Sequence, residues 1–544
     1  MKKVIKIIYV MIMVFSVILT AQDNSDIFAL IRANKTKEAI ELISQDGFNV
    51  NIQDLNGNTP LMHAVMRRNQ QLVQSLIEAK ANVNIKNGEG NTALTYSLTN
   101  RNNKILDMII ESGADIETKD ADGNTPLILA AINKNRQLTE TLIKNKANVN
   151  AKNKEGLTAL NYALNNRNNE IAKALIVAGA NINIKDEKGN TILMNLAYNN
   201  NYDLAKAIVV DTKADINVKN KEGFTALTFA AYRGSYDVAK LLIDSGANIN
   251  VKDLNGNTPL MYASFNNYTN VLQLLIDSGA NINERKSDGF TALMFAVYKG
   301  SYSTAEMLIQ NGADIKIKDA NGNDAFMYAA FNNRLNMLPL FTNSVNIDST
   351  NNMGRTPLIL ASINGHRNMV QALIKLNANI NAKDKDGNTA LMYAAFNNKS
   401  ALVNMLIDED ADLDVQNNIG VTALIFASMN GYNRIARTLI DAKADINIKD
   451  YYGNTALMYA AGRGNDKIIS LLNRNGSNID VQNRVGYTAL FFAAVNGYEQ
   501  SVQTLIDLKA DVGIKDTYGN TALTYAKERG YDSIVELLIK ASES

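Results

Sequence analysis

The chain has 544 residues, of which 46% are hydrophobic, and its 55 basic residues nearly balance its 54 acidic ones. A near-neutral chain lacks the excess of positive charge with which nucleic-acid binders attract phosphate, so we expect no nucleic-acid partner. Because the sequence contains no cysteine, disulfides, thiolate nucleophiles and cysteine-based zinc sites are all excluded.

The first 21 residues predict a signal peptide. Three lysines within the first six residues form a basic start, and a largely apolar run from Ile7 to Leu19 precedes Ala21, after which we expect cleavage. The run is shorter than the ~20 residues that a helix needs to cross a bilayer. We therefore expect export to the periplasm or beyond, from a bacterium whose AT-rich genome favours Asn, Ile and Lys. The alternative is an uncleaved membrane anchor, because Leu19 is large for its place before the cleavage site.

From residue 57 onward the sequence repeats itself. A Gly followed two residues later by Thr returns about every 33 residues, a period typical of solenoids, and in one copy Asp324 replaces the Thr. The glycines are Gly57, Gly90, Gly123, Gly156, Gly189, Gly223, Gly256, Gly289, Gly322, Gly354, Gly387, Gly420, Gly453, Gly486 and Gly519. Residues 22–56 lack this motif and are expected to form a degenerate N-terminal capping repeat.

Each repeat predicts two short helices that follow a tight turn. At residues 253–256 the sequence Asp-Leu-Asn-Gly predicts the turn, because Asp bonds to the backbone ahead of it and Gly adopts positive φ. Thr258 suits the N-cap of the first helix, and the Pro or Ala that follows such threonines is favourable at the first helical position. Gly300, or an Asn at the equivalent position, is expected to end that helix. Apolar residues four positions apart, such as Val238 and Leu242, mark the second helix.

Such short helices must stack on one another. Helices of this length are marginal alone, since ~12–15 residues are needed for weak isolated helicity, so neighbouring repeats have to supply the stability. The pattern Asp-x-x-Gly-x-Thr-Pro/Ala-Leu-x-x-Ala-Ala-x-x-Gly, followed by Val-x-x-Leu-Leu-Ile-x-x-Gly-Ala-x-Ile-Asn, resembles the ankyrin repeat over about residues 25 to 544. The resemblance implies an all-α solenoid, a stack of about 16 helix-turn-helix units with short β-hairpin-like loops. It predicts one continuous domain over residues 57–544.

Two departures from the family pattern carry expectations of their own. The family's His after Thr-Pro-Leu is replaced by apolar residues such as Met62 and Ile128, so adaptable packing is expected in place of its hydrogen bonding. The repeat at residues 322–353 lacks the Thr, is one residue short, and carries Pro339 where a helical hydrogen bond would be lost. We expect this repeat to be weak, with a local defect or hinge near residues 334–350.

The repeats alternate between two types. The residue three before Gly is Asp at 54, 120, 186, 253, 319, 384, 450 and 516, and Asn at 87, 153, 220, 351, 417 and 483, with Lys286 as the exception. In the Asp type, the residue after Gly is always Asn. Duplication of a two-repeat block explains this period of about 66 residues without any function, and we favour that interpretation. The alternative is that two surface textures alternate along a groove.

The resemblance also implies where a partner would bind. In ankyrin proteins, partners commonly meet the hairpin tips and the concave face of the first helices, and aromatic side chains there are suited to interfaces. Candidates in the hairpins are Tyr451, Tyr452, Tyr487, Tyr518, Phe224 and Phe290. Candidates near the ends of first helices are Tyr232, Phe265, Tyr298, Phe331 and Phe396. We favour the four tyrosines, which fall on three successive hairpins. The alternative is that these rings pack on neighbouring loops within the stack.

Other residue groups are better explained by the repeat itself. Lysines before the turns, such as Lys119 and Lys383, could attract an acidic partner, but they alternate with the Asp residues and predict a solvated, internally neutralised edge. Asp-rich turns such as residues 384–388 lack the later Glu of a calcium loop. His63 and His366 are the only histidines and lie far apart in the sequence. We find no catalytic triad, metal cluster or phosphate-binding loop in the sequence.

The sequence thus predicts a non-catalytic, exported scaffold that binds a protein partner and needs no cofactor or metal. Two rivals stay open. One is a structural spacer without a dedicated ligand in its groove, and the other is a surface rod held at the membrane by an uncleaved N-terminal segment.

Overall fold

The computed structural model describes residues 27–100, 102–212, 214–342 and 344–543. The predicted signal peptide lies outside the described residues. The chain separates into two compact units. The N-terminal unit runs to Ala230 and includes Asp237–Ala247, and the C-terminal unit comprises Ala231–Tyr236 and the chain from Asn248 onward. Each unit is described by itself.

The described chain is all-helical and contains no β-strand, which confirms the predicted fold class. Residues 27–32 are helical, and the second helix of the capping repeat is α2 (Thr36–Ile43). In the N-terminal unit, the helix pairs are α3 (Pro60–Met66) and α4 (Gln70–Glu78), α5 (Ala93–Asn100) and α6 (Asn103–Glu111), α7 (Pro126–Ile132) and α8 (Arg136–Lys144), α9 (Ala159–Asn165) and α10 (Asn169–Val177), and α11 (Ile192–Tyr198) and α12 (Tyr202–Asp211). Helices α13 (Ala226–Arg233) and α14 (Tyr236–Asp244) contain residues of both units.

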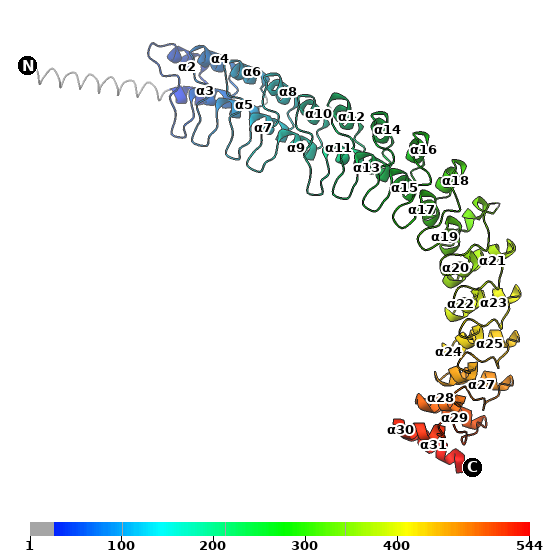
Figure 1. The fold of residues 1–544 in the computed structure, drawn as a ribbon. Helices are drawn as coiled ribbons and strands as arrows, with labels where there is room; N and C mark the ends of the chain where they lie inside the picture. Colours follow the sequence, from blue (N-terminus) through cyan, green and yellow to red (C-terminus); the bar gives the residue numbers. More distant parts are fainter. Residues whose placement is uncertain (1–26, 101, 213, 343, 544) are drawn as a thin grey trace, which may run out of the picture. The chain divides into compact units, whose positions relative to one another are not determined.

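The C-terminal unit continues the same alternation of helices. Its pairs are α15 (Pro259–Phe265) and α16 (Thr269–Asp277), α17 (Ala292–Lys299) and α18 (Tyr302–Gln310), α19 (Ala325–Phe331) and the 3₁₀ helix η1 (Leu335–Leu340), α20 (Pro357–Asn364) and α21 (Arg367–Lys375), α22 (Ala390–Phe396) and α23 (Ser400–Asp408), α24 (Ala423–Met429) and α25 (Asn433–Asp441), α26 (Ala456–Ala461) and α27 (Asp466–Arg474), α28 (Ala489–Val495) and α29 (Glu499–Asp507), and α30 (Ala522–Arg529) and α31 (Asp532–Glu543). Within each unit, the first helices form one row and the second helices another, and the hairpin loops extend from the row of first helices (Figure 1).

The predicted start and stop signals set the helix ends. Thr258 is the N-cap of α15, and its hydroxyl accepts the Met261 amide at 3.4 Å, with Pro259 at the first helical position. Helix α17 ends at Gly300, whose φ of 82° is left-handed, and Asn267 takes the same place after α15 with a φ of 60°. Both residue types tolerate this conformation, so they end the helices as predicted.

Small residues allow the first helices to pack closely. Ala263 on α15 and Ala296 on α17 are fully buried, as is Leu275 on the second helix α16. In most repeats, neighbouring first helices contact each other directly, and each also packs on its own second helix. Because each helix is too short to persist alone, this contact with neighbours stabilises every repeat.

Both repeat types form the same turn, in which one oxygen of the alternating Asp or Asn side chain accepts backbone amides. In the Asp type, Asp384 Oδ1 accepts the backbone amides of Asp386 and Asn388 at 3.0 and 2.9 Å. In the Asn type, Asn417 Oδ1 accepts the amides of Ile419 and Val421 at 3.1 and 2.9 Å. The turn alone therefore does not distinguish Asp from Asn.

The other atom of that side chain explains the alternation. Asp384 Oδ2 accepts the hydroxyl of Tyr393 within its own repeat at 2.6 Å. Asn417 Nδ2 instead donates to Asn388 Oδ1 of the preceding repeat at 2.9 Å. Equivalent bonds of 2.7–3.0 Å join Asn87 to Asn58, Asn153 to Asn124, Asn220 to Asn190, Asn351 to Asn323 and Asn483 to Asn454. Whatever its origin, the period of two repeats serves stacking, because it pairs a donor with an acceptor.

The exception at Lys286 supports this explanation. No Asn amide reaches Asn257 from that position, although Asn257 Nδ2 donates to Asp253 of its own repeat at 3.0 Å, as Asn124 does to Asp120. The ammonium of Lys286 pairs with Asp288. The change from Asn to Lys thus removes the bond between the two repeats and leaves the bond within the first one in place.

The lysines before the turns also tie repeats together. Lys119 Nζ donates to the carbonyl of Lys152 at 3.0 Å, and Lys383 Nζ donates to the carbonyl of Gln416 at 3.0 Å. Gln416 continues the series with a bond of 2.9 Å to the carbonyl of Lys449. These side chains therefore hold the next hairpin, which is more specific than the neutralised edge expected from the charge pattern.

The repeat at residues 322–353 departs from the others in its second helix. The segment Leu335–Leu340 forms the 3₁₀ helix η1, with Pro339 inside it. Phe341, which follows η1, is fully buried, and its ring packs on that of Phe326 at 5.7 Å between centroids. Large rings thus fill the core of a repeat that is one residue short.

Exchanging the donor of the amide pair for an acceptor should weaken stacking. In Asn417→Asp, a carboxylate oxygen would face Asn388 Oδ1, at a cost of about 1–3 kcal/mol for the unsatisfied groups. We expect faster hydrogen exchange in α22 and α24 than in the wild type. Asn433→Asp, an exposed position at the start of α25, makes the same change in charge and should leave exchange unaltered. Equal exchange in the two variants would contradict the role of the amide pair.

The 3₁₀ segment should open more readily than its neighbours. Hydrogen-bond geometry in a 3₁₀ helix is poorer than in an α-helix, and Pro339 donates no backbone bond. We expect amides at residues 337–342 to exchange faster than those of α18 and α21, measured by hydrogen–deuterium exchange with peptide mass spectrometry. Equal protection in all three segments would show that this repeat is no weaker than the flanking ones.

Candidate partner-binding surface

Backbone hydrogen bonds hold successive hairpin tips of the C-terminal unit side by side. The Tyr451 amide donates to the Ile419 carbonyl at 2.9 Å. The next hairpin is joined in the same way by the Arg484 amide and the Tyr452 carbonyl at 3.0 Å. A bond of 3.2 Å from the Thr517 amide to the Val485 carbonyl joins the last pair. The tips are therefore a connected row and not independent loops.

Exposed apolar and aromatic side chains lie along this row. Tyr451, Tyr452 and Tyr518 have exposed fractions of 59%, 60% and 75%, and Ile419 and Val485 are also exposed. We name these five residues the tip patch. Such large exposed side chains in series are unusual for a surface that contacts only water.

An arginine, Arg484, lies against the tip patch. The Arg484 guanidinium lies over the Tyr451 ring, 4.5 Å from its centroid, and the Tyr451 and Tyr452 rings meet edge to face at 5.6 Å. Aromatic–arginine contacts of this kind fix side chains before binding and lower the entropy lost on association. The candidate residues did not include Arg484, because its place beside the ring depends on the spacing between two hairpins.

Tyr487, Phe290 and Phe224 occupy a different environment from the tips. Tyr487 is half-buried and stacks on Phe491 at 5.1 Å, while its edge meets Tyr525 at 5.6 Å. Phe290 lies between Phe295 and Tyr328, 4.8 and 4.9 Å away. Phe224 meets Phe229 at 5.3 Å. Of the four favoured tyrosines, three therefore lie at the tips, and Tyr487 packs between two repeats.

Four of the five candidates at the ends of first helices pack on a ring of the next repeat. Their partners are the rings one repeat further on, in the pairs Tyr232–Tyr262, Phe265–Phe295, Tyr298–Tyr328 and Phe396–Phe426, with centroids 5.4 to 6.4 Å apart. Tyr232, Tyr298, Phe331 and Phe396 are still 38% to 47% exposed. Packing within the stack and exposure to a partner are therefore compatible for these rings.

Phe331 is placed differently because the next repeat carries a leucine instead of a ring. It lines a cavity of about 360 Å³ together with Met353, Tyr328, Arg355 and Leu360. The signal for this cavity in the sequence is Leu360, since most repeats of the C-terminal unit have Tyr or Phe at that position.

Tyrosine–aspartate bonds support the base of the hairpins. Tyr459 donates its hydroxyl to Asp450 Oδ2 at 2.5 Å. Burial, together with this hydrogen bond, raises the pKa of Tyr459 to about 12, so the phenol stays protonated and keeps its donor role at physiological pH. In the turn that resembles a calcium loop, Asp384 uses one oxygen for backbone amides and the other for Tyr393.

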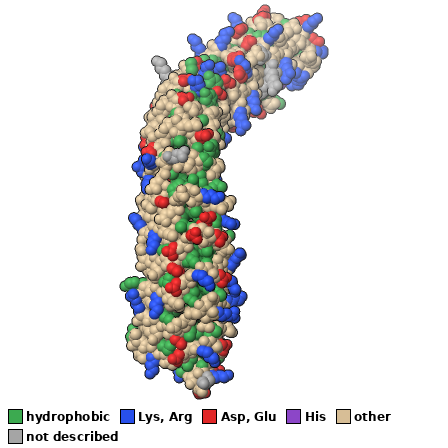
Figure 2. Space-filling view, turned by 90° about the vertical axis from the view of Figure 1, so that its right-hand side faces the viewer, with side chains coloured by type: hydrophobic (Ala, Val, Ile, Leu, Met, Phe, Trp, Pro, Cys, Tyr) green, Lys and Arg blue, Asp and Glu red, His purple; other side chains and the backbone are tan. Residues whose placement is uncertain are grey.

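Charge is distributed without a dominant sign. Figure 2 shows Lys and Arg side chains interspersed with Asp and Glu along the face that it draws. Within the described residues, no group of three or more His, Asp or Glu side chains is placed to hold a metal ion. Among the same residues, no helix is both long and apolar enough to cross a membrane.

Models of known protein families match almost the whole chain from residue 27 onward. A model of ankyrin repeats in three copies matches residues 27–120, 116–186, 165–253, 246–319, 326–417, 391–483 and 457–544, and a model of ankyrin repeats in many copies matches residues 298–342. The chain belongs to the ankyrin repeat family. No curated protein matches the ankyrin chain in a whole-sequence comparison. Ankyrin repeats typically mediate protein–protein interaction, and proteins built from them are generally non-catalytic scaffolds.

The departures from the ankyrin pattern have local explanations. Where the family has His, Met261 is buried, and its sulfur lies 3.5 Å from the Thr258 amide, which closes the helix start. His63, one residue later in its own repeat, bonds to Asp54 at 2.7 Å. His366 Nε2 lies 2.9 Å from the Phe331 carbonyl of the preceding repeat. His366 therefore contacts the preceding repeat, whereas the bond of His63 lies within its own repeat.

Proposed function

We propose that this ankyrin protein is an exported, non-catalytic scaffold that binds a protein partner through its hairpin tips and the adjoining face of its first helices. The observation that carries the proposal is the tip patch, in which three exposed tyrosines and two aliphatic side chains lie on hairpins joined by backbone bonds. A rigid aromatic row buries a large area at small entropic cost, which is the property that interface hot spots share.

The surroundings of the tip patch favour a partner that is not strongly charged. Arg484 is engaged with the Tyr451 ring, and the face drawn in Figure 2 carries both signs of charge. Association would therefore depend on desolvation of aromatic surface more than on electrostatic attraction, and it should persist at high ionic strength. The rings at the ends of the first helices extend the same contact across the row of first helices.

Removing the tip tyrosines should abolish capture of the partner. The triple variant Tyr451→Ala, Tyr452→Ala and Tyr518→Ala deletes three exposed rings, and we expect at least a tenfold loss of captured protein in pull-downs from the native cell envelope. The matched control is Tyr202→Ala with Tyr236→Ala, which removes exposed tyrosines from the starts of two second helices. Thermal melting should be unchanged in both variants, since none of these rings is buried. An unchanged set of captured proteins would favour the structural spacer.

Export predicts a defined mature N-terminus. Cleavage after Ala21 would leave Gln22 as the first residue, which mass spectrometry of the protein purified from its native host detects. Recovery in the soluble periplasmic or extracellular fraction is the expected companion result. Retention of the leader together with membrane association would replace export by the anchored alternative.

A further inference from the structure

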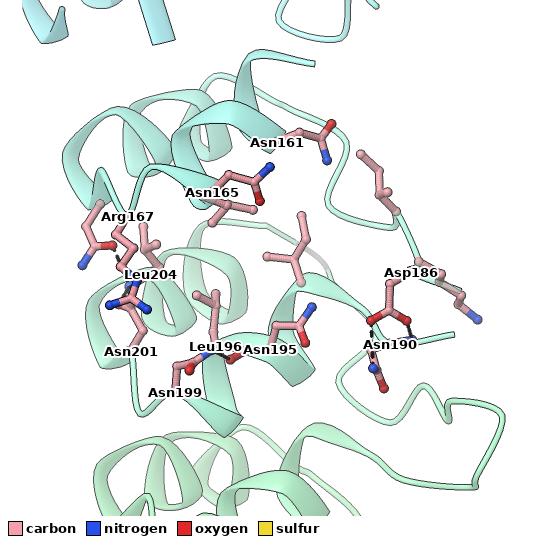
Figure 3. A pocket seen from close by; sticks show the side chains of 15 residues that line it. Asn161, Asn165, Arg167, Asp186, Asn190, Asn195, Leu196, Asn199, Asn201 and Leu204 are labelled. Carbon is pink, nitrogen blue, oxygen red and sulfur yellow. Dashed lines mark hydrogen bonds between the residues drawn. The ribbon is translucent and has the colours of Figure 1, made fainter. Parts of the chain in front are cut away.

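A polar slot opens between two neighbouring first helices of the N-terminal unit. It lies between α9 and α11 and has a volume of about 720 Å³, the size of a ligand site. Its lining combines side-chain amides, among them Asn161, Asn165 and Asn195, with apolar residues, among them Ile192 and Leu196. Figure 3 shows these amides between Arg167 and Asp186, which lie toward opposite sides of the view.

Two substitutions in α11 account for the opening. The residue after the N-cap Thr is Ala or Pro in every other repeat, but here it is Ile192. The residue five after that Thr is Ala or Ser in every other repeat, but here it is Leu196. These are the positions whose small size allows first helices to approach, so larger side chains hold α11 away from α9.

A pair of asparagines lies where other neighbouring first helices place a pair of rings. In the next interval of the same unit, Tyr198 and Phe229 meet edge to face at 6.0 Å. The equivalent residues across the slot are Asn165 at the end of α9 and Asn195 on α11. Without the two rings, the space between the helices stays open and its walls are polar.

These two amides retain their hydrogen-bonding capacity. Both are exposed, and within the described part of the chain neither side chain is hydrogen-bonded, whereas Asn201 Nδ2 donates to Asn169 Oδ1 at 3.0 Å. Each free amide presents one acceptor and two donor hydrogens to the slot. A residue of an extended chain points its backbone N–H and C=O to the same side, so one Asn side chain can hold one such residue by two bonds.

We propose that this slot binds an extended, uncharged segment of a polypeptide partner. The amides would bond to its backbone, and the apolar floor at Ile192 and Leu196 would receive a small aliphatic side chain, a division of roles known from other modes of peptide recognition. A strongly charged ligand is not favoured, because the lining carries both signs of charge, with Arg167 and Lys185 as well as Asp186. An oligosaccharide is disfavoured, because the described residues that line the slot include no aromatic ring to stack on a sugar face. The inference rests on the proposed function, since it gives the scaffold a second contact with protein.

The test selects peptides on a chain whose tip patch has been removed. A phage-displayed library of random heptapeptides is panned on the full-length Tyr451→Ala, Tyr452→Ala, Tyr518→Ala variant, and selected peptides are synthesised with blocked ends. Fluorescence polarisation then measures their affinity for the wild type at low and high salt. We expect sequences poor in charged residues whose affinity changes less than twofold with salt.

Two slot variants test separately whether binding needs the two amides and whether it needs the open space between the helices. Asn165→Ala with Asn195→Ala removes the bonds and should weaken binding at least tenfold. Asn165→Tyr with Asn195→Phe installs the ring pair of the next interval and should abolish binding without lowering the melting temperature. Asn430→Ala with Asn496→Ala, exposed asparagines at the ends of first helices α24 and α28, is the matched control and should bind as the wild type does.

Several results would contradict peptide binding at the slot and leave the proposal for the tip patch unaffected. They are equal affinity in the ring-pair variant, failure to select any peptide, or binding of malto- or chito-oligosaccharides in place of peptides. Conversely, if the tip variant still captures its envelope partner while slot peptides behave as expected, the proposed binding surface fails and the slot stands.

Discussion

Close approach of neighbouring first helices is the constraint on which the rest of this structure depends. The helices are too short to persist alone, so each repeat is stable only when its alanines lie against the next one. Ala263 and Ala296 are buried completely for this reason. The hairpins inherit their spacing from the same contact, and that spacing lets backbone amides of one tip reach the carbonyl of the one before it.

The contacts between successive repeats have the same geometry but use different side chains. Amide pairs such as Asn417 with Asn388 join an Asp-type repeat to the Asn-type repeat that follows it. Where an Asn-type repeat precedes an Asp-type one, rings can make the contact, as Tyr487 does against Tyr525. In a stack with two kinds of contact between repeats, one kind can change locally while the other maintains the register.

The repeat period, the N-caps and the left-handed helix ends could all be predicted from the sequence, because each depends on residues within a few positions of one another. The role of the Asp and Asn alternation could not, since both residues build the same turn and differ only in the atom that faces outward from it. The burial of Tyr487 was also beyond sequence reasoning, because Phe491 and Tyr525 come together only once two repeats have stacked. The tyrosines at the tips were easier to identify, since a residue between Asp and Gly in a tight turn has little to pack against.

The direction of the amide bond has a consequence for how such a chain can change length. Asn Nδ2 always points toward the preceding repeat, where an Asn carbonyl oxygen receives it. Loss of a single Asn-type repeat would set a carboxylate against that oxygen, and loss of a single Asp-type repeat would remove the oxygen, whereas loss of two successive repeats would restore donor to acceptor. Changes in the number of repeats in this protein should therefore involve pairs of repeats, and the chain around Lys286 keeps to that rule, since Asp253 and Asp319 flank it at the usual spacing.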